Sequence, residues 1–219
     1  MTLTFSLAHL MGGILLLCGF LLLSQRRLAA MITLYQVQAF TLAAAAFWQG
    51  YAQSEVNLYL TGLITLALKA VLLPLGLREI VRRFNLTRAV ETAMPMALSM
   101  LLGVGLIGIA VLVVLPTTMN AVSLTREDLA IALSVVLLGL LVMTSRRSAL
   151  AQIIGFLSTE NGLVLAAIGM PGMPFVAEFS VAMLVLLAFL VVGVFLLRIR
   201  EHFDTLDVTG IEDIERRGR

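Results

Sequence analysis

Residues 95–115 read PMALSMLLGVGLIGIAVLVVL, a run without a single ionisable side chain. A bilayer core about 30 Å thick requires roughly 20 apolar residues in a helix that rises about 1.5 Å per residue. The composition of the whole chain agrees, because 60% of its 219 residues are hydrophobic, 13% are charged and the mean hydropathy is +1.04. A soluble domain carries about a quarter charged residues. The sequence therefore predicts an all-α, polytopic integral membrane protein.

Six further apolar windows bring the predicted number of transmembrane helices to seven. In chain order the windows are Leu3–Leu23, Leu28–Trp48, Leu58–Leu77, Pro95–Leu115, Leu129–Ser145, Ser148–Ile168 and Phe175–Leu197. They assign residues 1–197 to one transmembrane domain and residues 198–219 to a polar cytoplasmic tail. Arg26 and Arg27 follow the first window and no basic residue precedes it. We therefore expect a retained helix there, not a cleaved signal peptide.

The arginines are distributed very unequally between the two predicted sides of the membrane. Every arginine except Arg126 follows the first, third, fifth or seventh window: Arg26, Arg27, Arg78, Arg82, Arg83, Arg88, Arg146, Arg147, Arg198, Arg200, Arg216, Arg217 and Arg219. Cytoplasmic loops carry the excess of basic residues in membrane proteins. The pattern predicts an external N-terminus and a cytoplasmic C-terminus. It also explains the pI near 9.1 without a nucleic-acid partner.

Two ionisable side chains lie near the middle of apolar windows, Lys69 in the third and Glu160 in the sixth. A charge at the bilayer centre costs about 2.5–3.5 kcal/mol on insertion scales, so such residues usually serve a function. Counting residues from the window ends places both at a similar depth. We expect an ion pair, direct or through water, if the two helices are neighbours. The simpler alternative for Lys69 is a snorkelling anchor.

Further polar residues suggest a proton path around these two charges. Gln36 and Gln38 lie in the second window, Asn161 follows Glu160, and Glu178 lies near the start of the seventh window. Amides and buried acids hold water chains in membranes, although the glutamines could instead join helices by hydrogen bonds.

The third window has its own irregularity. Pro74 should kink the helix and free a backbone carbonyl near Lys69. Gly62 and Gly76 lie seven residues to either side of Lys69, on its face of an α-helix, where they predict a close helix contact.

The sequence offers no catalytic centre. Cys18 is the only cysteine, which excludes a disulfide framework and any multi-cysteine metal site within the chain. We find no phosphate-binding loop, nucleophile–histidine pair or metal-ligand spacing. The sequence predicts no metal and no cofactor in this chain.

Three segments resemble the hydrogenase-4 component E family. They are Leu68-Lys69-Ala70-Val71-Leu72-Leu73-Pro74-Leu75, the stretch from Gln152-Ile153-Ile154-Gly155-Phe156 to Glu160-Asn161-Gly162, and Thr205-Leu206-Asp207-Val208. The resemblance covers nearly the whole chain. It implies a small membrane subunit of energy-converting [NiFe]-hydrogenase, formate hydrogenlyase or a related complex I-like machine.

The same resemblance implies partners and a role for Glu160. Roughly residues 121–197, the last three helices, look like the K-type subunit of complex I, whose intramembrane glutamates form part of a lateral proton path. Glu160 matches the first of these acids. The position of the second reads Ala182-Met183-Leu184-Val185, with only Glu178 nearby. Iron–sulfur clusters, and nickel–iron in hydrogenases, would lie in a peripheral hydrogenase-like arm beyond large antiporter-like and complex I-like membrane subunits.

Two other functions fit the sequence. A free-standing secondary ion transporter would also place charges at mid-membrane, but discontinuous helices are its usual mark and only Pro74 suggests one. A structural spacer subunit would need no ion path of its own. In the leading interpretation the coupled ion is H⁺, with Na⁺ as the alternative.

Reporter fusions test the predicted topology. Fusions after Arg82 and Arg146 should behave as cytoplasmic and those after Ser54 and Gly172 as external, because the arginines hold their loops in the cytoplasm. A cytoplasmic signal at Gly172 would contradict both the seventh helix and the orientation.

Overall fold

A computed structural model describes residues 2–83, 90–117 and 123–169, all within one compact unit, Met1–Glu178. Its helices are α1 (Thr2–Ser24), α2 (Leu28–Gln53), α3 (Val56–Ile64), the π-helix η1 (Thr65–Leu72), α4 (Leu73–Arg83), α5 (Met96–Thr117), α6 (Ser123–Ser145) and α7 (Ala149–Ile168). Because α3, η1 and α4 follow each other without a break, the described residues contain six helical units long and apolar enough to span a membrane. Six predicted windows are thereby confirmed as helices. The seventh window, Phe175–Leu197, and the tail lie outside the described residues.

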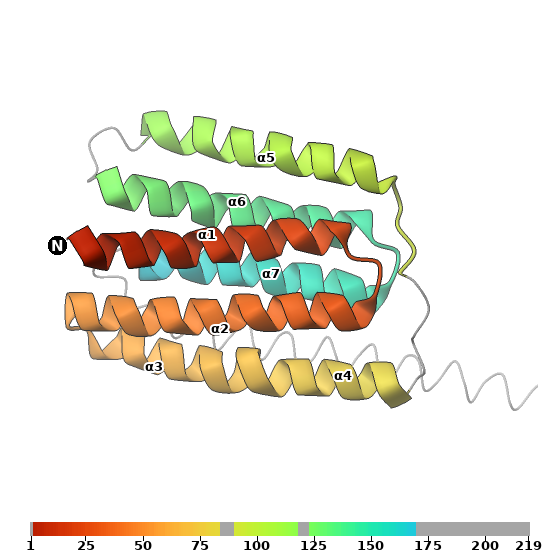
Figure 1. The fold of residues 1–219 in the computed structure, drawn as a ribbon, viewed down its shortest axis with the longest axis horizontal. Coiled ribbons are helices and arrows are strands. Elements are labelled where there is room, and N and C mark those ends of the chain that lie inside the picture. The colour runs from red at the N-terminus through yellow and green to blue at the C-terminus, as the bar shows by residue number, and fades with distance from the viewer. Residues whose placement is uncertain (1, 84–89, 118–122, 170–219) are drawn as a thin grey trace, which may run out of the picture. The chain divides into compact units, whose positions relative to one another are not determined.

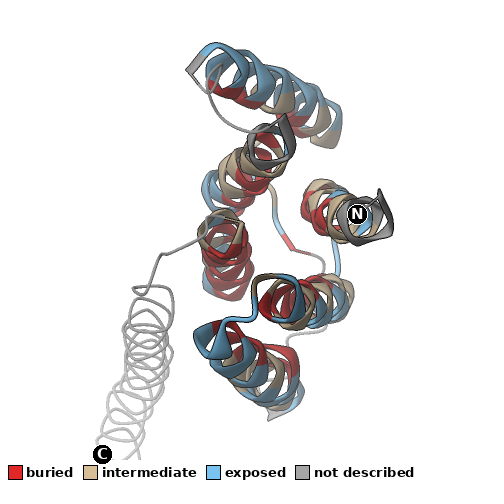
Figure 2. Cartoon of the chain, turned by 90° about the vertical axis from the view of Figure 1, so that its left-hand side faces the viewer, coloured by how far each residue is buried: buried red, intermediate tan, exposed pale blue. Residues whose placement is uncertain are grey.

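The helices run side by side and alternate in direction (Figure 1). Helix α7 packs along α6 and α2, and α1 contacts both α2 and α6. Helix α5 packs on α6, and the unit formed by α3, η1 and α4 packs on α2. Viewed along the helices, the buried residues face the interior of the bundle (Figure 2).

The arginine-bearing connections lie together at one end of this bundle, which we call the arginine end (Figure 1). There the segment before α5 joins the two neighbouring connections through backbone hydrogen bonds. Val90 N donates to Arg26 O at 2.7 Å, and Arg147 N donates to Glu91 O at 3.1 Å. The opposite end, where α2 passes into α3 at Ser54, is called the distal end.

Arg146 stabilises the arginine end from inside. Its side chain is buried, and Nη2 donates to Leu22 O at 3.1 Å and Leu23 O at 2.6 Å. These are carbonyls of the last turn of α1, which have no partner within their own helix. One arginine therefore ties the end of α1 to the connection between α6 and α7.

Helices α6 and α7 approach each other too closely for side chains at three glycines, Gly139, Gly155 and Gly162. A Cβ on Gly155 would lie 2.7 Å from Met143 N, and a Cβ on Gly162 would lie 2.8 Å from Val136 N. Backbone atoms cannot yield as a flexible side chain can, so both positions require glycine. This contact fixes the rotation of α7, which carries Glu160.

The irregularity expected near Pro74 takes the form of the π-helix η1, whose hydrogen bonds span one residue more than those of an α-helix. Leu73 N, for example, donates to Leu68 O. Pro74 itself lies within α4, and it lacks the N–H that would bond to the carbonyl of Ala70 in a regular α-helix.

The π-helix also corrects the expected face of Lys69. Gly62 packs against the ring of Phe47, where a Cβ would lie 3.0 Å from the ring atoms. Among the described residues nothing lies within 4 Å of a Cβ added at Gly76, so the predicted contact is not found there. The seven-residue spacing keeps one face in an α-helix, but the wider turn of η1 rotates Gly76 away from the face of Lys69.

Gly155→Leu tests the close contact of α6 and α7. We expect the free energy of unfolding to fall by about 1–3 kcal/mol or more, because the added side chain pushes the two backbones apart. Titration of the purified protein with a denaturing detergent measures this change. Gly105→Leu is the matched control, since a Cβ on Gly105 would have no neighbour within 4 Å in the part of the chain that the structure describes. Equal losses in the two variants would contradict the assignment.

Candidate functional site

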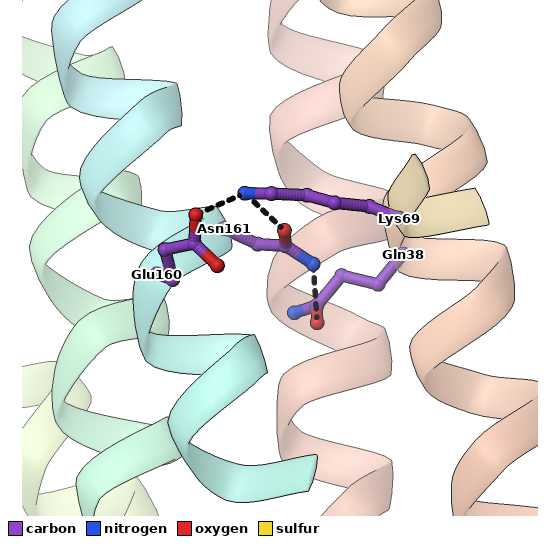
Figure 3. Close-up of polar contacts among 4 residues, drawn as sticks. All are labelled: Gln38, Lys69, Glu160 and Asn161. Carbon is purple, nitrogen blue, oxygen red and sulfur yellow. Dashed lines mark hydrogen bonds and ion pairs between the residues drawn. The ribbon is translucent and has the colours of Figure 1, made fainter. Parts of the chain in front are cut away.

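Lys69 and Glu160 form an ion pair inside the helix bundle (Figure 3). Lys69 Nζ on η1 lies 2.7 Å from Glu160 Oε1 on α7, and each side chain is 1% exposed. The sequence predicted such a pair only if the two helices were neighbours. The structure places the two side chains in direct contact, so Lys69 does not extend to an interface as an anchor would.

Two amides extend the ion pair into a network that joins four helical elements (Figure 3). Lys69 Nζ also donates to Asn161 Oδ1 at 3.5 Å, and Asn161 Nδ2 donates to Gln38 Oε1 at 3.4 Å. Gln38 Nε2 in turn donates to Leu15 O at 3.2 Å, on α1. Gln38 and Asn161 are both 0% exposed. The site thus connects η1, α7, α2 and α1.

The sequence of α7 explains why Glu160 and Asn161 face η1 and α2. Gly155, Thr159 and Gly162 follow a four- and three-residue spacing, which places them on one face of the helix. That face lies against α6. Glu160 and Asn161 lie away from this face, since each residue advances the helix by about 100°. The glycine contact therefore points the acid and the amide toward Lys69.

Burial makes the two charges depend on each other. Oε2 of Glu160 has no hydrogen-bond partner among the described residues, so Lys69 supplies the main compensation for the carboxylate. Removing one member of a buried ion pair typically costs about 3–5 kcal/mol, because an uncompensated charge is left behind. The pair can also be neutral if the proton moves from the ammonium to the carboxylate.

Tyr35, which the sequence did not single out, lies on α2 beside this network. Its side chain is 0% exposed, its hydroxyl has no hydrogen-bond partner among the described residues, and it lies within electrostatic reach of Glu160. The hydroxyl of Ser158 on α7 is likewise buried without a partner. Because α2 and α7 run in the same direction, both residues lie about one turn from the contact of Gln38 with Asn161. The only sequence signal for Tyr35 was its three-residue spacing from Gln38, which places both side chains on one face of α2.

Gln36 lies outside the ion pair and contacts the residue that follows Lys69 in the chain. Its Nε2 donates to Ala70 O at 3.0 Å, the carbonyl to which Pro74 cannot donate. Its Oε1 accepts a hydrogen bond from Arg78 Nη2 at 2.7 Å. Glu178, the remaining predicted site residue, lies outside the described residues.

Metal binding finds no support in the described part of the chain, where no group of three or more histidine, cysteine or acidic side chains comes together. Cys18 is buried. At the distal end, His9 of α1 lies between two acids of α6, 3.4 Å from Glu127 and 3.2 Å from Asp128. These contacts join the two helices.

Comparison with known proteins identifies a relative over almost the whole chain. No protein-family model and no solved structure matches it. The chain is 30% identical over 205 residues to an uncharacterized protein of Mycobacterium tuberculosis, Rv0085, and the match covers 93% of each chain. The chain therefore belongs to the same family as Rv0085.

Proposed function

We propose that this chain is a non-redox membrane subunit of a complex I-like energy-converting oxidoreductase of the hydrogenase-4 or formate hydrogenlyase type. It would span the bacterial inner membrane with its N-terminus outside and contribute to proton translocation through Lys69 and Glu160. The observation that carries the proposal is the fully buried ion pair between η1 and α7. The family resemblance supplies the class of complex.

Stability alone is a poor reason to keep these charges. Well-packed hydrophobic residues often replace a buried ion pair without loss of stability, or even with a gain. The helices also have other means of association, such as the glycine contact of α6 with α7. Inserting this charged pair into a membrane costs free energy, and packing does not require it. The pair therefore indicates a function that needs charge.

The pair can respond to a charge that changes nearby. When a positive charge approaches from a neighbouring subunit, the carboxylate is stabilised as the anion and the amine loses its proton more readily. When that charge leaves, Lys69 takes up a proton again. Lysine is suited to this cycle, whereas arginine keeps its proton at any accessible pH. The electrons would pass through iron–sulfur clusters, and in a hydrogenase a nickel–iron centre, of partner subunits.

Purification of the tagged chain from its native membranes tests the assignment to a complex. We expect large antiporter-like membrane subunits and iron–sulfur proteins to copurify and to be identified by mass spectrometry. A chain that arrives alone and moves H⁺ or Na⁺ in vesicles by itself would identify a free-standing transporter instead.

Glu160→Gln tests the proton path within the purified complex. The amide keeps the size and hydrogen bonding of the side chain but cannot ionise, so we expect assembly to persist while proton movement in reconstituted vesicles is lost. A fluorescent pH indicator inside the vesicles measures that movement. An intact complex with unchanged proton movement would favour the structural spacer.

Lys69→Arg and Lys69→Met separate switching from a fixed charge. If release of the proton matters, both variants should impair coupling, although arginine conserves the charge. Assembly must be measured in each, since arginine is bulkier and Lys69 is fully buried. Full coupling in an assembled Lys69→Arg complex would contradict switching.

A further inference from the structure

We propose that the Lys69–Glu160 site exchanges protons with the arginine end only, through water along a polar route lined by Arg78, Gln36 and the Ala70 carbonyl. The inference rests on the proposed function, because it gives the direction from which the proton site is loaded. It adds Arg78 as a positioning residue. It also means that protons do not reach the ion pair through the distal half of the bundle.

The route begins on the surface of the bundle, in the seam between α2 and α4. Arg78 is exposed on α4, and its Nη2 donates to Gln36 Oε1 at 2.7 Å and to Thr33 Oγ1 at 3.4 Å. A side chain in a helix is tilted toward the helix N-terminus, which for α4 means toward η1. The side chain of Arg78 therefore extends along α4 toward η1, where it orients the amide of Gln36.

Gln36 carries the route to the backbone beside Lys69. With its oxygen held by Arg78, its amide nitrogen donates to Ala70 O at 3.0 Å. Pro74 lacks the N–H that would bond to that carbonyl in a regular α-helix. Ala70 directly follows Lys69 in η1. Arginine, amide and carbonyl thus form one line of hydrogen-bonding groups that ends at the residue next to Lys69 in the chain.

The polar contacts described in the distal half lie near its end: Gln53 Nε2 donates to Ile168 O at 3.3 Å and to Gln49 Oε1 at 3.2 Å, and His9 lies against Glu127 and Asp128. Among the described residues, no line of side chains comparable to Arg78 and Gln36 leads from these contacts to the ion pair.

Beyond Gln38 and Asn161 the interior is filled by an apolar cluster: Leu15, Leu42, Ala45, Ala46, Leu58, Ala132, Val135, Val164, Leu165 and Ile168. Two buried hydroxyls of that half serve their own helices, since Thr61 donates to Asn57 O at 3.0 Å and Ser134 donates to Ala130 O at 2.7 Å. Neither hydroxyl bridges two helices.

A site open toward one end cannot act as a straight pore. A proton that enters from the arginine end must return the same way or leave sideways, through the flank of the bundle. Sideways transfer suits a subunit that passes charge to a neighbour in a larger membrane complex.

Cysteine accessibility tests the one-sided route without any measurement of activity. In a Cys18→Ala background, the variants Gln36→Cys and Leu42→Cys are each treated with a membrane-impermeant methanethiosulfonate reagent. The reagent modifies a cysteine only where water reaches its thiol. The full chain is probed in sealed native vesicles of both orientations. Arg82→Cys and Ser54→Cys mark the arginine end and the distal end, because both positions are exposed.

We expect Gln36→Cys to react only from the side that modifies Arg82→Cys, and Leu42→Cys to react from neither side. Reaction of Leu42→Cys or Gln36→Cys from the Ser54 side would overturn the proposal. If Gln36→Cys reacts from neither side, the proposal is also overturned.

A second arm measures proton movement in the reconstituted complex. Gln36→Leu should slow it by about tenfold or more, since hydrogen bonds to a charged donor are of the size that changes a rate by that factor. Thr61→Val, a matched change in the distal half, should leave it unchanged. If Thr61→Val slows transport and Gln36→Leu does not, the route is wrong while Glu160 keeps its role. If Glu160→Gln has no effect, the proposed function itself fails.

Discussion

One positive and one negative charge are buried against each other where apolar helices exclude water, and the rest of the structure must accommodate them. At this site Lys69 and Glu160 lie 2.7 Å apart on elements separated widely in the sequence. The attraction is strong only while both partners stay in place, since either one alone would be an uncompensated charge in a medium of low dielectric constant. The arrangement of η1 and α7 therefore has to be held within narrow limits.

Three local features hold η1 and α7 in the positions that the ion pair requires. The glycines of α6 and α7 fix the rotation of α7, because backbone atoms occupy the space of any added Cβ. The π-helix sets the direction of Lys69, and Gln36 donates to the Ala70 carbonyl, to which Pro74 cannot donate. Asn161 and Gln38 then join the pair to α2 and α1. Since an amide donates and accepts at once, each can link two neighbours without adding charge.

The sequence predicted the helices well because a membrane span leaves a signal in length and composition that needs no tertiary information. Lys69 and Glu160 were recognisable for the same reason, as charges in apolar windows. Their contact was not predictable, since it depends on which helices are neighbours. Gly76 was misplaced because its spacing assumes an α-helical turn. Tyr35 and Arg78 were not recognised as neighbours of the site, because an isolated tyrosine, or an arginine at the end of an apolar window, has no distinctive pattern.

The most direct test of this account is a double-mutant cycle on Lys69 and Glu160, with the free energy of unfolding of the purified chain measured by titration with a denaturing detergent. Lys69→Met and Glu160→Gln should each cost about 3–5 kcal/mol, because each leaves one buried charge without its partner. The double variant contains neither charge and should cost far less than the two single changes together. Strictly additive losses would contradict the account, because they would mean that the two charges do not interact in the folded protein.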